Sequence, residues 1–518
     1  MSREPNILFL LSDEHNAKCL GHVDGSTVRT PSLDRLADQG TRFTRAVTQS
    51  PICTPSRISF ASGQYPHNHG YYGLAGETCG PSLVDRVPHL FGHLKQHGYA
   101  IGAVGKSHLP PGWIESGCDR FVEDKDPDQG YPAFLRDRGI DPDRSAALSW
   151  GKRIKADGAN RFGHDFGPDD LPYEQSVEHW EASEAIAFLE AHQDRPMFLQ
   201  VGFWRPHTPC TPSPEFWEMY PDESLAAPPN IDYSMAGQPA MLREQRAQLE
   251  AMEAERYAFE PRTYQAMRRR YLRGYYGCIT QMDRAIGEVL DALDRLGLAD
   301  DTIVVYSSDH GDFAMEHGLT EKVPGIWSDA VTRIPMIWRW PGRVEAGHVS
   351  DCLVESVDLA PTVCSLTGIE AMPTADGVDL TPLMQGGETP LRDVAVTENP
   401  RTRSVYDQRY RLVHTALDTS IAAADGDRGA LYDHREDPWE MRNLIDDPGH
   451  GDVVAELRRR LLDHTLATTR VATTHPSLDR AGRPFGKASG GRKHRVDGDG
   501  KRGPAYIDAV ARWQDRYL

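Results

Sequence analysis

The sequence predicts an α/β protein whose mostly parallel central sheet is covered by helices on both faces. Short apolar runs that suit buried strands alternate with helical patterns over the first two thirds of the chain. Polar residues follow four of these runs directly, and open α/β sheets bind their ligands outside the carboxyl ends of the strands. The predicted strands are residues 7–11, 100–104, 197–201, 303–306 and 335–338.

Helices are predicted between these strands because apolar residues recur at helical spacing and a glycine closes most of the segments. The segments are residues 31–39 before Gly40, 87–97 before Gly98, 177–191, and the longest within 261–296 before Gly297.

A further short helix is predicted to begin at Cys53, in the sequence Cys-Thr-Pro-Ser-Arg. Pro55 suits a first helical turn and Gly63 a left-handed C-cap. The helix dipole and the free N–H groups would stabilise negative charge at Cys53, and Arg57, one turn later, adds a cation that can bind an oxyanion. Taken alone, such a motif is more often a buried structural cysteine beside a surface arginine.

The polar residues that follow the strands form the candidate site. They are Asp13 after the first run, Lys106 and His108 after the second, His207 after the third, and Asp309 and His310 after the fourth. Because the carboxyl ends of parallel strands lie at one edge of a sheet, we expect these side chains to converge on one pocket.

Residues 53–57 resemble the Cys-x-Pro-Ser-Arg signature of the type I, formylglycine-dependent sulfatases of the alkaline phosphatase superfamily. Residues 98–108 are similar to the second family signature, although Ile101 and Ser107 depart from it. Residues 206–209, residues 308–312 and Lys322 follow in family order, and a family-like stretch covers residues 431–444. The resemblance therefore extends over residues 6 to about 340 and into the C-terminal part.

The resemblance implies hydrolysis of sulfate monoesters. A maturation enzyme would oxidise Cys53 to Cα-formylglycine, whose hydrated aldehyde attacks sulfur and later re-forms as sulfate leaves. Arg57 and Lys106 would hold the hydrate, and His108 would take the proton of its second hydroxyl. Asp309 would accept the proton of the attacking hydroxyl.

The family pattern also implies roles for the remaining site residues. His207 and Lys322 would bracket the sulfate and stabilise or protonate the leaving oxygen. One divalent metal ion would be bound by Asp13, Glu14, Asp309, His310 and the modified side chain of Cys53. Oxygen-rich ligation suits calcium or magnesium, and the histidine admits manganese as well.

The chain divides into three expected parts, the first two from the resemblance and the third from composition. Residues 1–388 would form the catalytic sulfatase-like domain, and residues 389–470 a smaller α+β subdomain with an antiparallel sheet. Residues 471–518 read as an extended arm, rich in Gly, Lys and Arg, followed by a terminal helix. Two hypotheses for this arm stay open: it reaches a neighbouring subunit in a homo-oligomer, or it is a loose tail.

Composition limits the partners and the compartment. The chain has 518 residues, of which 39% are hydrophobic and 26% charged, as in a soluble globular enzyme. A formal net charge of −19 disfavours nucleic acid and long polyanions, so a small sulfated substrate fits better. The first apolar run is too short for a signal peptide and no window suits a membrane span, so we expect a cytoplasmic protein with no membrane partner.

The eight cysteines are scattered without a zinc-like spacing, so only Cys53 lies in a sequence context that suggests a chemical role.

The alternative enzyme is a phosphonate monoester or phosphodiester hydrolase of the same superfamily. That branch tends to carry Tyr and Thr where this chain has Lys106 and His108, which favours a sulfatase. A second alternative is a non-catalytic protein that binds sulfated ligands with Cys53 unmodified. Aryl, alkyl, choline-like and saccharide sulfates all stay open as substrates.

Overall fold

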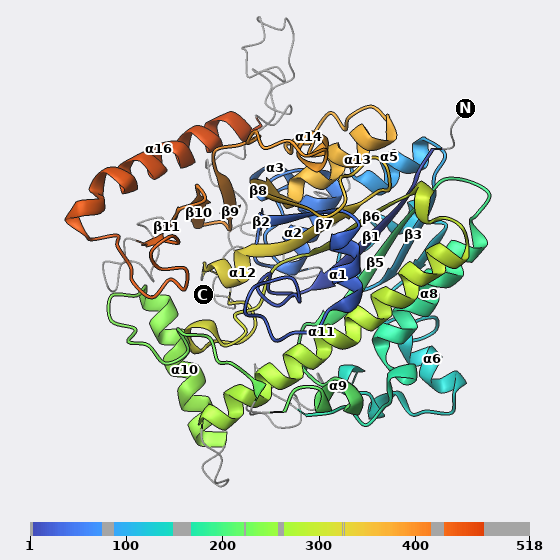
Figure 1. The fold of residues 1–518 in the computed structure, drawn as a ribbon, viewed down its shortest axis with the longest axis horizontal. Helices are drawn as coiled ribbons and strands as arrows, with labels where there is room; N and C mark the ends of the chain where they lie inside the picture. Colours follow the sequence, from blue (N-terminus) through green and yellow to red (C-terminus); the bar gives the residue numbers. More distant parts are fainter. Residues whose placement is uncertain are drawn as a thin grey trace, which may run out of the picture.

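The computed structural model describes residues 4–74, 87–148, 167–221, 224–256, 264–323, 325, 327–415 and 429–470. Figure 1 shows a main body built on one large sheet and a smaller unit with its own sheet. None of the helices in these ranges is long and apolar enough to cross a membrane. The predicted arm and terminal helix, residues 471–518, lie outside the described residues.

The main sheet has eight strands in the order β4-β3-β5-β1-β6-β7-β2-β8. All neighbouring pairs are parallel except those of β7, which runs antiparallel to both β6 and β2. The strands are β1 (Asn6–Asp13), β2 (Thr41–Val47), β3 (Ala100–Gly105), β4 (Arg120–Val122), β5 (Met197–Pro206), β6 (Thr302–Ser308), β7 (Arg333–Arg339) and β8 (His348–Glu355).

Helices cover both faces of this sheet, as the alternation of side chains along β1 illustrates. Phe9 points to one face, where it packs with α2 (Cys53–Ser62), α5 (Leu90–Gln96) and α13 (Leu359–Thr367). Leu8 and Leu10 point to the other, where they pack with α1 (Pro31–Asp38), α8 (Val177–Ala191) and α11 (Tyr264–Arg295). Because both faces are buried, β1 reads as one continuous apolar run.

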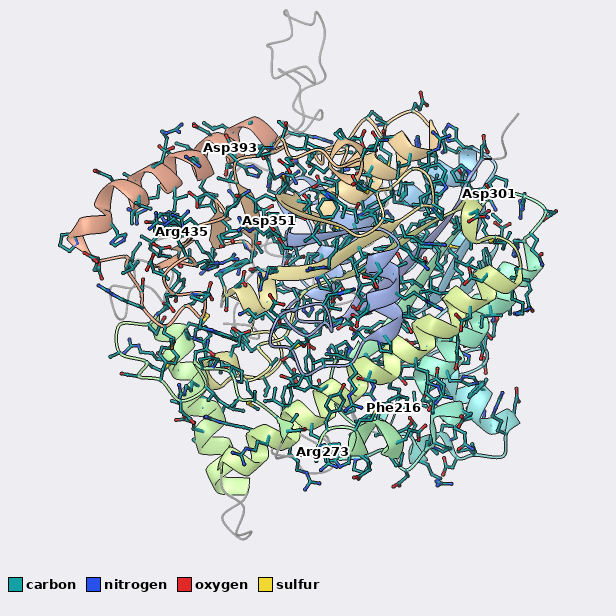
Figure 2. All side chains as sticks on the ribbon, viewed as in Figure 1. Phe216, Arg273, Asp301, Asp351, Asp393 and Arg435 are labelled. Atoms are coloured by element: carbon teal, nitrogen blue, oxygen red, sulfur yellow. The ribbon has the colours of Figure 1, made fainter. Side chains whose placement is uncertain are left out.

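The remaining α-helices lie around this body and in the smaller unit. They are α3 (Pro66–His69), α6 (Tyr131–Asp137), α9 (Pro214–Glu218), α10 (Ala240–Arg256), α12 (Asp329–Thr332), α14 (Thr381–Met384) and α16 (Gly451–Thr468). Figure 2 labels Phe216 and Arg273 where α9 meets α11. Phe216 is buried in the core, and Nε of Arg273 donates a hydrogen bond of 2.9 Å to the carbonyl of Trp217.

The smaller unit is built on a four-stranded antiparallel sheet in the order β12-β11-β10-β9. Its strands are β9 (Ala395–Glu398), β10 (Thr402–Tyr406), β11 (Tyr410–Thr415) and β12 (Ala430–Asp433). Helix α16 covers one face of it, with Leu457 packed among the buried strand residues Val405, Leu412 and Leu431.

The predicted α/β class, with a mostly parallel sheet and a small antiparallel sheet near the C-terminus, is confirmed. The predicted start of the helix at residue 87 is wrong, because α5 begins at Leu90. Pro88 disfavours a helical conformation in the residue before it, and the ring of His89 caps the helix by accepting from the N–H of Gly92 at 3.1 Å. Helix α2 begins at Cys53 and closes at Gly63, whose φ is 68°, as predicted.

Candidate active site

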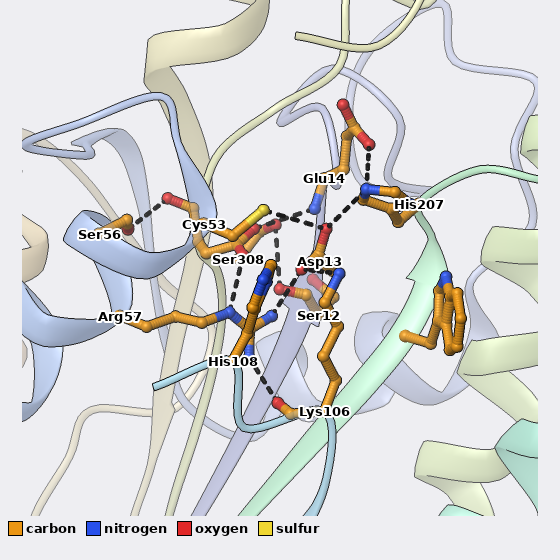
Figure 3. A network of polar contacts seen from close by, with 12 residues as sticks. Ser12, Asp13, Glu14, Cys53, Ser56, Arg57, Lys106, His108, His207 and Ser308 are labelled. Atoms are coloured by element: carbon orange, nitrogen blue, oxygen red, sulfur yellow. Dashed lines mark hydrogen bonds and ion pairs between the residues drawn. The ribbon is translucent and has the colours of Figure 1, made fainter. Parts of the chain in front are cut away.

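The carboxyl ends of β1, β3, β5 and β6 meet at one edge of the main sheet (Figure 3). The register pairs Asp13 of β1 with Pro206 of β5, and Ser12 of β1 with Ser308 of β6. The residues that directly follow β5 and β6, His207 and Asp309, therefore lie on either side of Asp13. This topology brings together side chains that are almost 300 positions apart in the sequence.

Lys106 enters the site because β3 and β5 approach each other closely at their ends. The N–H of Lys106 donates to the carbonyl of Gly202 at 2.7 Å. A Cβ atom at position 202 would lie 2.1 Å from the carbonyl oxygen of Lys106, so only glycine allows this approach. From there the Lys106 side chain reaches Asp13, with 2.7 Å between Nζ and Oδ2.

Helix α2 presents Cys53 to the end of the sheet. Its Sγ lies 3.2 Å from Nε2 of His310 and 3.8 Å from Oδ1 of Asp13. Two hydroxyls of the first turn fix the helix: Ser56 Oγ donates to the carbonyl of Asp309 at 2.6 Å, and Thr54 Oγ1 donates to the carbonyl of His108 at 2.9 Å. Cys53 is therefore held at a helix N-terminus and faces the carboxylates.

Arg57 joins the two aspartates beneath Cys53. Its Nη2 lies 2.9 Å from Oδ2 of Asp13, and its Nε lies 2.8 Å from Oδ2 of Asp309. Nη1 donates to the carbonyl of Lys106 at 2.6 Å. Although burial opposes charge, Asp309 and Asp13 raise the pKa of Arg57, which stays a cation in this site.

The acidic side chains and imidazoles form two overlapping sets of potential metal ligands. In the first set, ligand atoms of Asp13, Cys53, Asp309 and His310 all lie within 4.8 Å of one another. The second set, within the same limit, consists of Asp13, Glu14 and His207.

The chemistry of these donors fits a hard divalent cation. Nδ1 of His310 lies 2.9 Å from the carbonyl of Gly311, so it carries the proton and leaves Nε2 free to bind a metal. Oε1 of Glu14 is fully buried and makes no hydrogen bond to any described residue. A buried carboxylate oxygen without a partner is costly, and a cation would satisfy it.

The pKa shifts of the site residues also indicate an excess of buried negative charge. Burial raises the pKa of Glu14 well above its usual value, and the Lys322 cation offsets this only in part. Burial and the neighbouring Asp13 raise the pKa of Asp309 to about 6. Against the effect of burial, Asp309 and the Cys53 sulfur raise the pKa of His310 to about 10. A divalent cation at this position would balance the charge of the buried carboxylates.

His207 and Lys322 both lie next to the carboxylate of Glu14. Nδ1 of His207 donates to the carbonyl of Thr208 at 2.8 Å, so its Nε2 faces Glu14, with 3.7 Å to Oε2. Nζ of Lys322 is 3.4 Å from the same Oε2. Burial, Lys106 and Lys322 lower the pKa of His207 well below its usual value. Against burial, the Cys53 sulfur and Glu14 raise the pKa of Lys322, so Lys322 is the charged donor of the two.

His108 is held through its backbone rather than through its ring. Its carbonyl accepts from Thr54, and its φ of 49° is in the left-handed region that non-glycine residues rarely adopt. Nδ1 of the ring is buried and makes no hydrogen bond to any part of the chain that the structure describes. Figure 3 shows the ring beside Arg57 and Lys106.

The structure brings all the predicted site residues to this edge of the sheet. Sequence reasoning missed Ser308, whose hydroxyl donates to the carbonyl of His310 at 2.8 Å. Its position directly before Asp309 and His310 was the available signal. The ring of Trp204 lies 5.8 Å from Nζ of Lys106, whereas Trp327 packs among residues of the smaller sheet.

The sequence is similar to known proteins over most of its length. A family model described as Sulfatase matches residues 5–369, and one described as N-sulphoglucosamine sulphohydrolase, C-terminal, matches residues 316–467. A choline-sulfatase of Rhizobium meliloti is 27% identical over 467 residues, which cover 86% of this chain and 83% of that protein. Iduronate 2-sulfatase of Mus musculus is 30% identical over 407 residues, which cover 71% and 69%.

Solved structures share the fold. One, determined with D-glucosamine-2-N,6-O-disulfate bound, has a TM-score of 0.68 at 22% identity and covers 90% of this chain and 98% of its own. A phosphonate monoester hydrolase from Silicibacter pomeroyi has a TM-score of 0.75 at 25% identity and covers 93% and 99%.

Proposed function

The chain belongs to the sulfatase family and hydrolyses sulfate esters, and from this premise we propose that Cys53 acts after conversion to Cα-formylglycine beside one bound divalent metal ion. The observation that carries this proposal is the position of Cys53 at the start of α2, with its Sγ 3.2 Å from His310 and 3.8 Å from Asp13. The maturation enzyme of the family is the partner that the proposal requires.

The surroundings of position 53 favour an anionic nucleophile. Burial and Asp13 oppose ionisation of the thiol, but Lys322, His310 and Lys106 hold the pKa of Cys53 well below its usual value. The same cations would favour the ionised form of an oxygen nucleophile at this position. A formylglycine hydrate would supply that oxygen, together with a second hydroxyl from which the aldehyde can re-form.

Each of the remaining residues has a role that its contacts support. Asp13, Glu14, Asp309 and His310 would hold the metal ion, which when bound polarises a sulfate oxygen. Lys106 and Arg57 stabilise negative charge at position 53, and His108 has a free ring nitrogen to accept a proton. Lys322, cationic and turned toward the same space, donates to the leaving oxygen, with His207 beside it.

Removal of the metal ion is expected to lower sulfatase activity by at least about 100-fold, because a Lewis acid contributes several kcal/mol to stabilising the transition state. Activity would be measured after chelation and after addition of calcium, magnesium or manganese in turn. Asp309→Asn should lose the ion in elemental analysis. The matched control Asp283→Asn alters a buried carboxylate that binds the N–H groups of Ser32 and Leu33, and should retain the ion. Full activity of a metal-free preparation would contradict the assignment.

Matched esters test the reaction itself. We expect kcat/KM for 4-nitrophenyl sulfate to exceed that for the corresponding phosphodiester and phenylphosphonate. The structural likeness to phosphonate monoester hydrolases makes those esters the second candidate substrates. Lys106 and His108 favour the sulfate. A higher kcat/KM for the phosphonate would reverse this order.

A further inference from the structure

We propose that Glu440, in the C-terminal part of the chain, is a positioning residue for Lys322, because its carboxylate fixes both ends of the loop that carries Lys322 (described residues 317–323, 325, 327 and 328). The inference rests on the role proposed above for Lys322 at the leaving oxygen. It concerns residues outside the cluster that surrounds Cys53, and it explains why a stretch beyond residue 430 matters to chemistry at the main sheet.

The carboxylate of Glu440 is 2% exposed and is surrounded by donors from the loop. Ser328 Oγ donates to Oε2 at 2.5 Å, and the N–H of Asp329 lies 3.1 Å from Oε2 and 3.2 Å from Oε1. At the other end of the loop, Nε2 of His317 lies 3.9 Å from Oε2. One carboxylate therefore contacts the loop on both sides of Lys322.

The charge of Glu440 is balanced within its own part of the chain. Nε of Arg411 lies 3.3 Å from Oε1, and Nε2 of His434 lies 2.9 Å from the same oxygen. Arg411 is fully buried and also contacts Asp329, with 3.2 Å between Nη2 and Oδ1. Glu440 therefore connects β11 to the loop, because its carboxylate contacts both Arg411 of β11 and Ser328 of the loop.

Trp439, the neighbour of Glu440 in the sequence, contacts Lys18 in the segment that follows β1. The ring of Trp439 lies 4.3 Å below Nζ of Lys18, and that ammonium pairs with Glu316 at 2.7 Å. Lys18 follows Asp13 and Glu14 in the sequence. Trp439 and Glu440 together therefore contact both segments that bear charged groups of the site.

The backbone supports the same conclusion. Glu440 has a φ of 53° and His317 a φ of 55°, both in the left-handed region that side-chain-bearing residues rarely adopt. His317 is 1% exposed, and its Nδ1 lies 2.8 Å from the hydroxyl of Tyr233. Such conformations persist where surrounding contacts determine them.

The middle of the loop depends on fewer contacts. Glu321 is held by Thr208, with 3.0 Å between Oγ1 and Oε1, and its carbonyl accepts from the N–H of Phe313 at 3.0 Å. Among the described residues, Lys322 makes a polar contact only with Glu14, with 3.4 Å between Nζ and Oε2. If the ends of the loop loosen, the ammonium of Lys322 loses its alignment with the leaving oxygen. The loss in kcat/KM should be largest for sulfate esters whose leaving group needs a proton most.

The experiment compares leaving groups in the variant Glu440→Gln, which keeps the shape of the side chain and removes its charge. We expect kcat/KM to fall by roughly 10- to 100-fold for an alkyl sulfate, as for small misplacements of catalytic groups. For 4-nitrophenyl sulfate we expect a loss below about threefold, since that leaving group departs without a proton. Ser328→Ala removes one donor from the loop, and should show the same trend even if Glu440→Gln folds poorly.

Glu355→Gln is the matched control. Glu355 is also fully buried and also joins the main sheet to the smaller one, accepting from the Tyr65 hydroxyl at 2.6 Å and the N–H of Val396 at 2.8 Å. Because it contacts none of the described residues of this loop, its replacement should affect both substrates equally.

Two measurements separate failure of this inference from failure of the role of Lys322. Amide hydrogen exchange in residues 317–323 should be roughly tenfold faster or more in Glu440→Gln than in the wild type. Unchanged exchange, or equal losses for both substrates in Glu440→Gln and Ser328→Ala, overturns the inference. If Lys322→Met itself shows no preference between leaving groups, the proposed role of Lys322 is wrong, whereas the exchange result still decides whether Glu440 holds the loop.

Discussion

Replacement of Cys53 by alanine is expected to abolish sulfate ester hydrolysis, lowering kcat by about 10⁴-fold or more, as for other enzymes that lose their nucleophile. The Cβ of alanine cannot be converted to an aldehyde hydrate, and no described hydroxyl takes the place of Sγ beside Asp13 and His310. Initial rates with 4-nitrophenyl sulfate would measure the effect. Cys118→Ala, at a half-buried cysteine whose Sγ contacts the carbonyl of Ile114, should retain wild-type activity.

The modification itself can be observed in the tryptic peptide of residues 46–57. When the protein is produced together with a maturation system, we expect this peptide to carry an aldehyde that reacts with a hydroxylamine probe. Cys53→Ala should not react. An unmodified thiol in active wild-type protein would contradict the formylglycine proposal, and an unmodified thiol in inactive protein would favour the non-catalytic binder.

Replacement of Arg57 by methionine is expected to lower the free energy of unfolding of the metal-free protein by about 3–5 kcal/mol, as when one partner of a buried ion pair is removed. The change leaves the carboxylates of Asp13 and Asp309 buried without the cation that lies 2.9 and 2.8 Å from them. A bound divalent ion would restore part of the charge balance. Denaturant unfolding with and without a chelator would therefore show a larger loss in the metal-free state.

A surface arginine provides the control for this experiment. Arg35 pairs with Asp291 at 2.8 Å, and both side chains are exposed, at 42% and 66%. Arg35→Met should change the free energy of unfolding by less than about 1 kcal/mol, because water screens such pairs. Equal stability of Arg57→Met and wild type in chelator would mean that Asp13 and Asp309 are not both ionised in the folded protein.

The local pattern of the sequence was enough to predict much of the fold and of the candidate site. The apolar runs at residues 7–11 and 303–306 lie in β1 and β6 because strands buried on both faces are apolar throughout. The cysteine helix began at Cys53 because proline and glycine restrict the backbone locally. In contrast, β2 alternates buried and half-buried residues near the edge of the sheet and carries Arg42 and Arg45, so its pattern did not mark it as a strand.

By itself, the sequence determined the strands and the helix that bear the site residues, since side-chain size, periodicity and backbone restriction act over a few neighbouring positions. Only the tertiary structure decided that β7 runs antiparallel, that Trp204 lies beside Lys106, and that Glu440 holds the loop that bears Lys322. Apart from the pairing of β7 with β6, these contacts join residues more than 90 positions apart. They form because buried charges must be paired and apolar faces must be buried by partners from distant parts of the chain, and a local sequence pattern does not contain this information.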